Sequence, residues 1–220
     1  MDQTAIIRQM ERLTAYMEIQ NLMGRYSFWL TAGMHTECST LFALDTPGVW
    51  VEMQWGRYEG RKDIEKIYPP ERNEDPEERR GMMHMHALTT PVIEIAGDCG
   101  TAKAVWISPG HQTMPSGENG KLGSFWSWIR YSAEFVREKG QWKIWHLSTN
   151  GIFMTHYTVP WTEDSSAMLP PMPEIPEDLR PSAPRSGVPW EYSTDKIFLN
   201  DPEPPEPYDT YGQIDKKIAN

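Results

Sequence analysis

The stretch MHMHALTTPVIEIAGDCGTAKAVW, residues 83–106, indicates the fold class. Residues 85–95 and 101–107 are rich in β-branched and aromatic side chains, which favour strands, and Gly97-Asp98 between them is a turn signal. The same composition returns further along the chain. We therefore predict a strand meander, in which segments 123–138 and 141–148 follow and turns fall at 108–110, 116–120 and 139–140.

Helical periodicity precedes these strands. Apolar residues recur every three to five positions over residues 2–33, which predicts a helix with Asp2 or Thr4 as N-cap and Gly33 as its end. The apolar stripe drifts between Met17 and Leu22, so we expect a kink or two abutting helices. The stripe comprises Ile6, Met10, Leu13, Met17, Leu22, Tyr26 and Trp29 or Leu30.

The order of the elements predicts the fold class. Shorter helical segments are expected over 38–43 and 60–68, with a strand candidate over 49–54 between them. Helices that come first, followed by a run of strands, indicate an α+β fold in which the helices pack on one face of a curved antiparallel sheet.

Composition limits the class of function. The chain has 220 residues, enough for one sizeable core, and its net charge of −10 argues against nucleic-acid binding. We find no apolar run long enough for a membrane span and no signal peptide, and two cysteines are too few for a disulfide framework. We therefore expect a cytoplasmic protein. Ten Trp and thirteen Met suit either a ligand pocket or an ordinary core.

The C-terminal part has a different character. Twelve of the 19 prolines lie between Val159 and Tyr208, which excludes helix and sheet interior there. A solvated tail would not need the apolar residues of this part. They are Trp161, Met168, Leu169, Trp190, Tyr192, Ile197, Phe198 and Leu199. We predict one domain over 1–155 and an extended arm over 156–220 that packs on the domain or on a neighbouring subunit; a disordered tail is the alternative.

Two histidines in the opening stretch are candidates for chemistry. His84 and His86 point to one face of a strand, because side chains alternate. A metal site would need a third ligand such as Glu94, His111 or His146, and no metal-binding spacing is present, so we predict no metal. An acid–base role for His86 and simple hydrogen bonding within the sheet both remain open.

A tyrosine on the first helix is the other candidate. Tyr26, in GRYSFW, brings a phenol into the core, where it is either a donor to a developing oxyanion or a packed core residue. The chain has no G-x-S-x-G nucleophile motif and no nucleotide-binding fingerprint. Any chemistry must therefore use side-chain acids and bases without a cofactor.

Four segments together suggest a family. RYSFWLTAG (25–33), LFALDTPGVWVEMQWGRYEGRKDIEKIY (41–68), the opening stretch and RYSAEFVREKGQWKIWHL (130–147) resemble, in order and spacing, the SnoaL-like branch of the NTF2-like superfamily. The resemblance covers about residues 5–155. It implies a cone-shaped, cystatin-like α+β fold whose curved antiparallel sheet wraps the helices and encloses one apolar pocket. It also implies a homodimer or homotrimer.

The resemblance implies roles for individual residues. The chain is similar to bile acid 7α-dehydratase and scytalone dehydratase, whose matching tyrosine and histidine make Tyr26 and His86 the expected catalytic pair. Thr31 stands where the first of these enzymes has an aspartate, and an inward-facing Glu52 would replace that carboxylate. The expected substrate-binding residues are His84, Thr31, Trp50, Glu52, Arg130, Ser148 and Asn150.

The expected activity follows from these residues. We predict a cofactor-independent lyase, either a dehydratase or a deformylating enzyme, that acts on a hydrophobic aromatic or polycyclic small molecule. One alternative is a ketosteroid-isomerase-like enzyme that uses Glu52 as its base. The other is a non-catalytic binding or assembly module. In each case we expect a ring-containing ligand and neither nucleic acid nor membrane as a partner.

Overall fold

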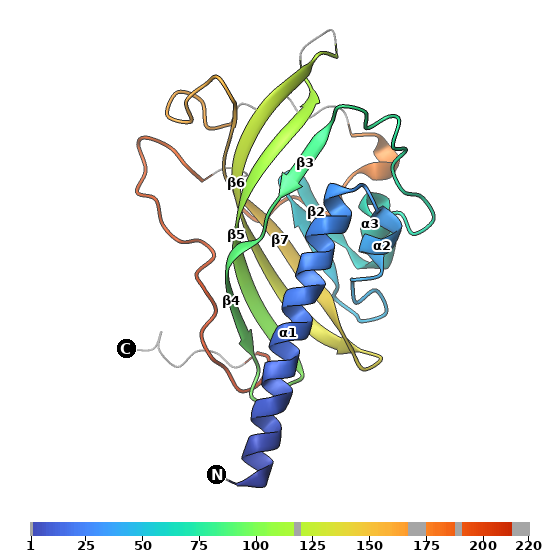
Figure 1. The fold of residues 1–220 in the computed structure, drawn as a ribbon, viewed down its shortest axis with the longest axis vertical. Coiled ribbons are helices and arrows are strands. Elements are labelled where there is room, and N and C mark those ends of the chain that lie inside the picture. The colour runs from blue at the N-terminus through green and yellow to red at the C-terminus, as the bar shows by residue number, and fades with distance from the viewer. Residues whose placement is uncertain (1, 117–119, 167–174, 188–190, 213–220) are drawn as a thin grey trace.

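A computed structural model describes residues 2–116, 120–166, 175–187 and 191–212. One long helix crosses a curved, unclosed sheet, and two short helices lie beside it (Figure 1). The helices are α1 (Gln3–Thr31), α2 (His35–Ser39) and α3 (Gly60–Ile67), with a 3-10 turn at Glu177–Leu179. The strands are β1 (Trp50–Met53), β2 (Gly56–Glu59), β3 (Met83–His86), β4 (Thr89–Ile95), β5 (Thr101–Pro115), β6 (Leu122–Glu138) and β7 (Gln141–His156).

The sheet has the order β2-β1-β7-β6-β5-β3, and β4 also pairs with β5. All pairs are antiparallel except β1 with β7, which run parallel. The α+β prediction is confirmed, while the prediction of a purely antiparallel sheet is corrected to a mixed one. β1 lies beside β7, the last strand, and not beside β3, the next strand along the chain after β2. β1 and β7 run in the same direction, so this pair is parallel.

Two strand predictions differ from the structure around Pro109. The predicted strand 85–95 is divided into β3 and β4, and the predicted turn 108–110 lies inside β5. Along one edge of β5, β3 pairs up to Gly110 and β4 begins to pair at Ile107. Pro109 therefore faces the break between these two strands, where its missing N–H removes no ladder hydrogen bond on that edge.

Helix α1 is continuous, so the prediction of two abutting helices is wrong. Its buried residues are Ala15, Ile19, Leu22, Met23 and Tyr26, and it ends before Gly33, whose φ of +69° favours glycine. These residues pack against the sheet and form the core with α2 and α3.

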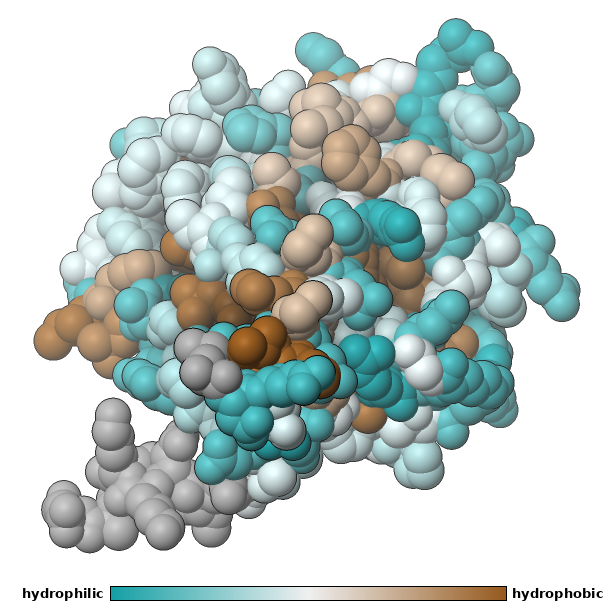
Figure 2. Space-filling view, turned by 60° about the horizontal axis from the view of Figure 1, so that its bottom comes forward, coloured by the Kyte–Doolittle hydropathy of each residue, from teal (hydrophilic) through white to brown (hydrophobic). Residues whose placement is uncertain are grey.

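The apolar face of α1 changes sides along the helix. Ile6, Met10, Leu13 and Met17 are 43–66% exposed. Ile6, the first residue of this exposed set, precedes Ala15, the first residue of the buried set, by nine positions. Nine positions are two and a half turns at 3.6 residues per turn. The two sets therefore lie on opposite sides of one helix, and this explains the drift in the sequence pattern. Figure 2, which brings the N-terminal end of α1 forward, shows apolar side chains at the surface there.

The C-terminal segment runs along the sheet and pairs with its edges. Arg57 and Ala183 exchange backbone hydrogen bonds at β2, and Glu191 and Tyr192 donate to the carbonyls of Gly151 and Ile152 in β7. Near its far end, the carbonyl of Tyr208 accepts the N–H of Gly97. The segment thus satisfies backbone groups at open strand edges. The predicted domain boundary at 155 stays a prediction.

Aromatic residues attach the start of this segment. Trp161 stacks on Phe153 with ring centroids 5.2 Å apart and meets Trp126 edge-on at 5.2 Å. Of the other apolar residues singled out in the arm, Met168, Leu169 and Trp190 lie outside the described residues. In the parts of the chain that the structure describes, no helix is long and apolar enough to cross a membrane.

Candidate active site

The two faces of the sheet divide the predicted site residues. Tyr131 packs edge-on against Tyr26 of α1, so its strand neighbour Arg130 points to the opposite face. Likewise Val51 is fully buried in the core, which places Trp50 and Glu52 on the other side. The structure therefore brings Tyr26, His84 and His86 to the inner face, under α1. It places Trp50, Glu52, Arg130, Ser148 and Asn150 on the outer face.

His86 lies at the end of β3, opposite Gly110 of β5. Its Nε2 lies 3.1 Å from the amide nitrogen of Gln112, and its backbone carbonyl accepts a 2.6 Å hydrogen bond from Ser27 Oγ of α1. Its Nδ1 is buried and has no hydrogen-bond partner among the described residues. The ring is thus held by β5 and α1 while one nitrogen stays available.

A cluster of hydroxyls accompanies this nitrogen. A Cβ added at Gly110 would stand 2.4 Å from Ser127 Oγ and 2.9 Å from His86 Nδ1, so these two atoms face the same small space. Ser108 is fully buried two residues before Gly110 and therefore on the same face of β5. Within the described residues, the hydroxyls of Ser108 and Ser127 and the Nε2 of His84 are also buried without a partner. Such unpaired polar atoms are rare inside a fold, and a water molecule or a polar group of a ligand would pair with them.

Burial controls the protonation of His86. Desolvation, with a smaller contribution from His84, lowers the pKa of His86 to about 4. Burial also lowers the pKa of His84. The His86 imidazole is therefore neutral near pH 7, which leaves one ring nitrogen a donor and the other an acceptor.

Tyr26 belongs to a separate group of phenols. Its hydroxyl lies 2.7 Å from the hydroxyl of Tyr68, and its ring meets those of Phe42, Tyr68 and Tyr131 edge-on. Burial, and then the neighbouring Tyr68, raise the pKa of Tyr26 well above its usual value. Tyr26 is therefore a neutral hydrogen-bonding group, adjacent in sequence to Ser27, which contacts His86.

Glu52 is held on the outer face by the C-terminal segment. Its side chain is 3% exposed and accepts hydrogen bonds from Arg57 Nε at 3.1 Å, the backbone N–H of Ser186 at 3.0 Å and Ser186 Oγ at 2.9 Å. Burial alone would raise the pKa of Glu52, but the hydrogen bonds from Ser186 and Arg57 outweigh it and the pKa is lowered. A carboxylate stabilised in this way is a poor general base.

The remaining predicted residues on the outer face also contact this segment or its neighbours. Arg130 donates to Glu191 at 2.6 Å and to the carbonyls of Leu199 and Asp201, and Asn150 accepts a 2.6 Å hydrogen bond from Arg185. Ser148 donates weakly to Glu52 and Asn150, and Trp50 stacks on His146 at 4.8 Å. Thr31, at the end of α1, accepts a hydrogen bond from Arg79 through its backbone carbonyl. Of the outer-face side chains, Glu52, Arg130 and Asn150 bind the C-terminal segment, and they do not share a site with His86.

Sequence reasoning missed four residues around His86: Ser27, Ser108, Gln112 and Ser127. The available signal was parity along β5, because Ser108 and Gln112 alternate in step with the buried Ala104 and Trp106. Treating 108–110 as a turn removed that signal.

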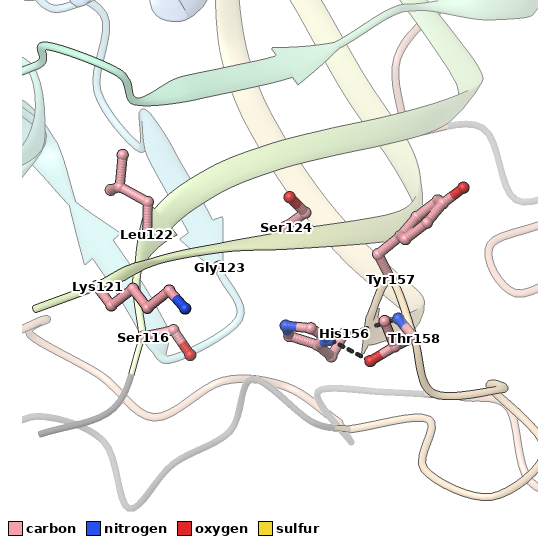
Figure 3. A pocket seen from close by; sticks show the side chains of 8 residues that line it. All are labelled: Ser116, Lys121, Leu122, Gly123, Ser124, His156, Tyr157 and Thr158. Atoms are coloured by element: carbon pink, nitrogen blue, oxygen red, sulfur yellow. Dashed lines mark hydrogen bonds between the residues drawn. The ribbon is translucent and has the colours of Figure 1, made fainter.

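Two pockets lie elsewhere on the molecule. One of about 350 Å³ lies beside the β5–β6 hairpin and the end of β7, where His156 Nδ1 and Thr158 Oγ1 are 2.8 Å apart (Figure 3). The other, of about 410 Å³, lies between α1 and β4 beside Leu13, Tyr16 and Ile93. Among the described residues, no three His, Cys, Asp or Glu side chains gather as a metal site requires.

Comparison with known families agrees with this architecture. The profile of the SnoaL-like domain matches residues 11–148, most of the chain before the C-terminal segment. The chain belongs to the SnoaL-like domain family. The predicted SnoaL-like relationship is thereby confirmed. No curated protein matches the chain.

Solved structures share the fold at low sequence identity. A putative scytalone dehydratase from Novosphingobium aromaticivorans has 18% identity and a TM-score of 0.51, with 67% of this chain and 91% of that chain covered. The structure of LinA has 14% identity and a TM-score of 0.53, with 70% and 96% covered. The hexachlorocyclohexane dehydrochlorinase LinA-type3 from Novosphingobium barchaimii has 16% identity and a TM-score of 0.51, with 69% and 99% covered.

Proposed function

We propose that this SnoaL-like protein is a cofactor-independent lyase that eliminates a leaving group from a hydrophobic, ring-containing small molecule. The observation that carries the proposal is the buried inner-face cluster of His86, Ser108 and Ser127, in which the Nδ1 of a neutral imidazole and two hydroxyls have no partner among the described residues. In this proposal His86 is the acid–base residue, and the hydroxyls bind the oxygen or halogen substituent of the substrate.

Tyr26 enters the proposal through its phenol pair. The 2.7 Å bond between Tyr26 and Tyr68 is compatible with either hydroxyl as the donor. When Tyr68 donates, the proton of Tyr26 is free to hydrogen-bond a substrate oxygen that gains charge. Its raised pKa keeps that proton in place at neutral pH.

The names of similar structures support an elimination in general and leave the leaving group open. One is named a dehydratase and another a dehydrochlorinase, so both water and chloride are candidate leaving groups. Loss of formaldehyde from a hydroxymethyl substituent is the third candidate. An isomerase that uses Glu52 is not favoured, because Glu52 lies on the outer face with a lowered pKa.

The test begins with a thermal-shift screen of bile acids, steroids, naphthols, hydroxymethyl diaryl compounds and cyclic organochlorines, since ligands of the folded state raise the unfolding midpoint. Each compound that binds is then incubated with the protein, and the eliminated product is measured by mass spectrometry. His86→Gln should lower turnover by roughly 10²- to 10⁴-fold. The matched control is His111→Gln, an exposed histidine on the other face of β5, which should leave turnover unchanged.

Two results would contradict the proposal. One is full activity in His86→Gln. The other is tight binding of these compounds with no turnover, which would instead support a binding module. The predicted homodimer or homotrimer and the cytoplasmic location stay predictions.

A further inference from the structure

The hydrogen bond between Gln112 and His86 carries information about the proton on the imidazole. The amide nitrogen of Gln112 lies 3.1 Å from His86 Nε2. An amide NH₂ group only donates, so Nε2 must be the acceptor. In a neutral imidazole the other nitrogen then carries the proton, and that nitrogen is Nδ1, which faces the space shared with Ser127.

We infer that Gln112 is a positioning residue that fixes the tautomer of His86 with the proton on Nδ1, so that His86 presents a hydrogen-bond donor to its ligand. An acceptor on the ligand, such as a carbonyl, ether or hydroxyl oxygen or a halogen, would be recognised at this nitrogen. The role toward a leaving group rests on the proposed function. Within it, Nδ1–H is the group that His86 presents to the leaving atom as that atom gains negative charge.

The place of Gln112 in the sheet makes the contact well defined. Gln112 pairs with His84 of β3 on one side and with Phe125 of β6 on the other, so its backbone is fixed by two neighbouring strands. The backbone of His86 is held in turn by its pairing with Gly110 and by Ser27 of α1. Both members of the pair are therefore attached to rigid elements, as a tautomer-setting contact requires.

The ring has no competing partner that would select the other tautomer. Nδ1 makes no hydrogen bond to any of the described residues. The pKa of about 4 keeps the ring from becoming doubly protonated near neutral pH. Gln112 is thus the group that decides between two tautomers of otherwise similar energy. Rotating its amide by 180° would place the oxygen at Nε2 and reverse the assignment, which makes the inference testable.

The experiment is NMR of the full-length protein with ¹⁵N-labelled histidine at pH 7, without ligand. Nitrogen shifts distinguish a protonated ring nitrogen from a bare one, and the His86→Gln spectrum assigns the signals of His86. We expect the proton on Nδ1 in the wild-type protein. Gln112→Leu should abolish this preference, and Gln112→Glu should move the proton to Nε2, because a carboxylate only accepts. Thr113→Val, on the opposite face of β5, should leave the spectrum unchanged.

A wild-type proton on Nε2 would overturn the inference, as would a His86 tautomer that stays the same in Gln112→Glu. The wild-type spectrum decides the first point even if a variant fails to fold. The result is independent of the proposed lyase activity. A proton on Nδ1 in a protein that turns over none of the screened compounds would reject the function and retain the role of Gln112. Turnover by a protein with the proton on Nε2 would support the function and reject the role of Gln112.

Discussion

Replacing Glu52 by Gln should loosen the C-terminal segment without changing the chemistry of the inner face. The buried carboxylate accepts hydrogen bonds from Arg57 and from the backbone and hydroxyl of Ser186, and Arg185 lies 4.0 Å away. An amide removes the buried counter-ion of both guanidinium groups, and Arg57 then keeps only the exposed Glu59 as a carboxylate partner among the described residues. Removing one member of a buried ion pair costs about 3–5 kcal/mol. For a chain of this size that lowers Tm by roughly 6–20 °C.

Thermal unfolding and limited trypsin digestion measure this effect. The side chain of Arg185 is only 7% exposed, and cleavage after it should accelerate once its partner carboxylate is lost. The matched control is Glu59→Gln. Glu59 lies 4.0 Å from the same Arg57 but is 55% exposed, so its loss should cost less than about 1 kcal/mol. Equal Tm values for the two variants, or loss of turnover with intact stability in Glu52→Gln, would refute the reasoning.

Three further predictions concern the inner face and α1. Gly110→Ala should destabilise the fold by about 1–3 kcal/mol and shift the His86 NMR signals, because the added Cβ would stand 2.4 Å from Ser127 Oγ; unchanged signals would contradict it. Leu22→Ala should cost about 2–5 kcal/mol and Leu13→Ala less than about 0.5 kcal/mol by chemical unfolding, since only Leu22 is buried; equal costs would disprove the change of face. Because the folded pKa of His86 is about 4, its contribution to stability is complete above pH 6.5 and falls by up to about 3 kcal/mol toward pH 4. His86→Gln should remove this part of the Tm–pH profile, and an unaltered profile would argue against the lowered pKa.

The elements were largely predictable because local composition decides them. The end of α1 before Gly33, the starts of the strands after residue 100 and the turn at Lys139-Gly140 all follow from residues whose conformational preferences act locally. The parallel pairing of β1 with β7 was not predictable in this way, since it joins Glu52 to Ser148 across the whole domain. Pro109 shows the same limit, because a proline fits inside β5 here only since it faces the break between β3 and β4.

The candidate site was predictable only in part, for a physical reason. His86 stood out because histidine has few roles in a strand, while Ser108 and Ser127 become notable only when their burial is known. The resemblance made the outer-face residues Glu52 and Arg130 expected substrate ligands, yet their charge does not tell a substrate ligand from an anchor for the chain's own C-terminal segment. That distinction depends on the face of the sheet to which each side chain points, and a one-residue change of register reverses that face.

The contact between Glu52 and the C-terminal segment links the presence of the segment in related proteins to the charge at the position of Glu52. The SnoaL-like match ends at Ser148, whereas the partner of Glu52, Ser186, lies far beyond it. A chain shortened after β7 would expose the carboxylate that Ser186 covers in this protein, so deletion of the segment and loss of the charge should occur together. Family members that stop after their last strand are therefore expected to carry an uncharged residue at the position of Glu52, and those that retain the acid should also retain a segment to cover it.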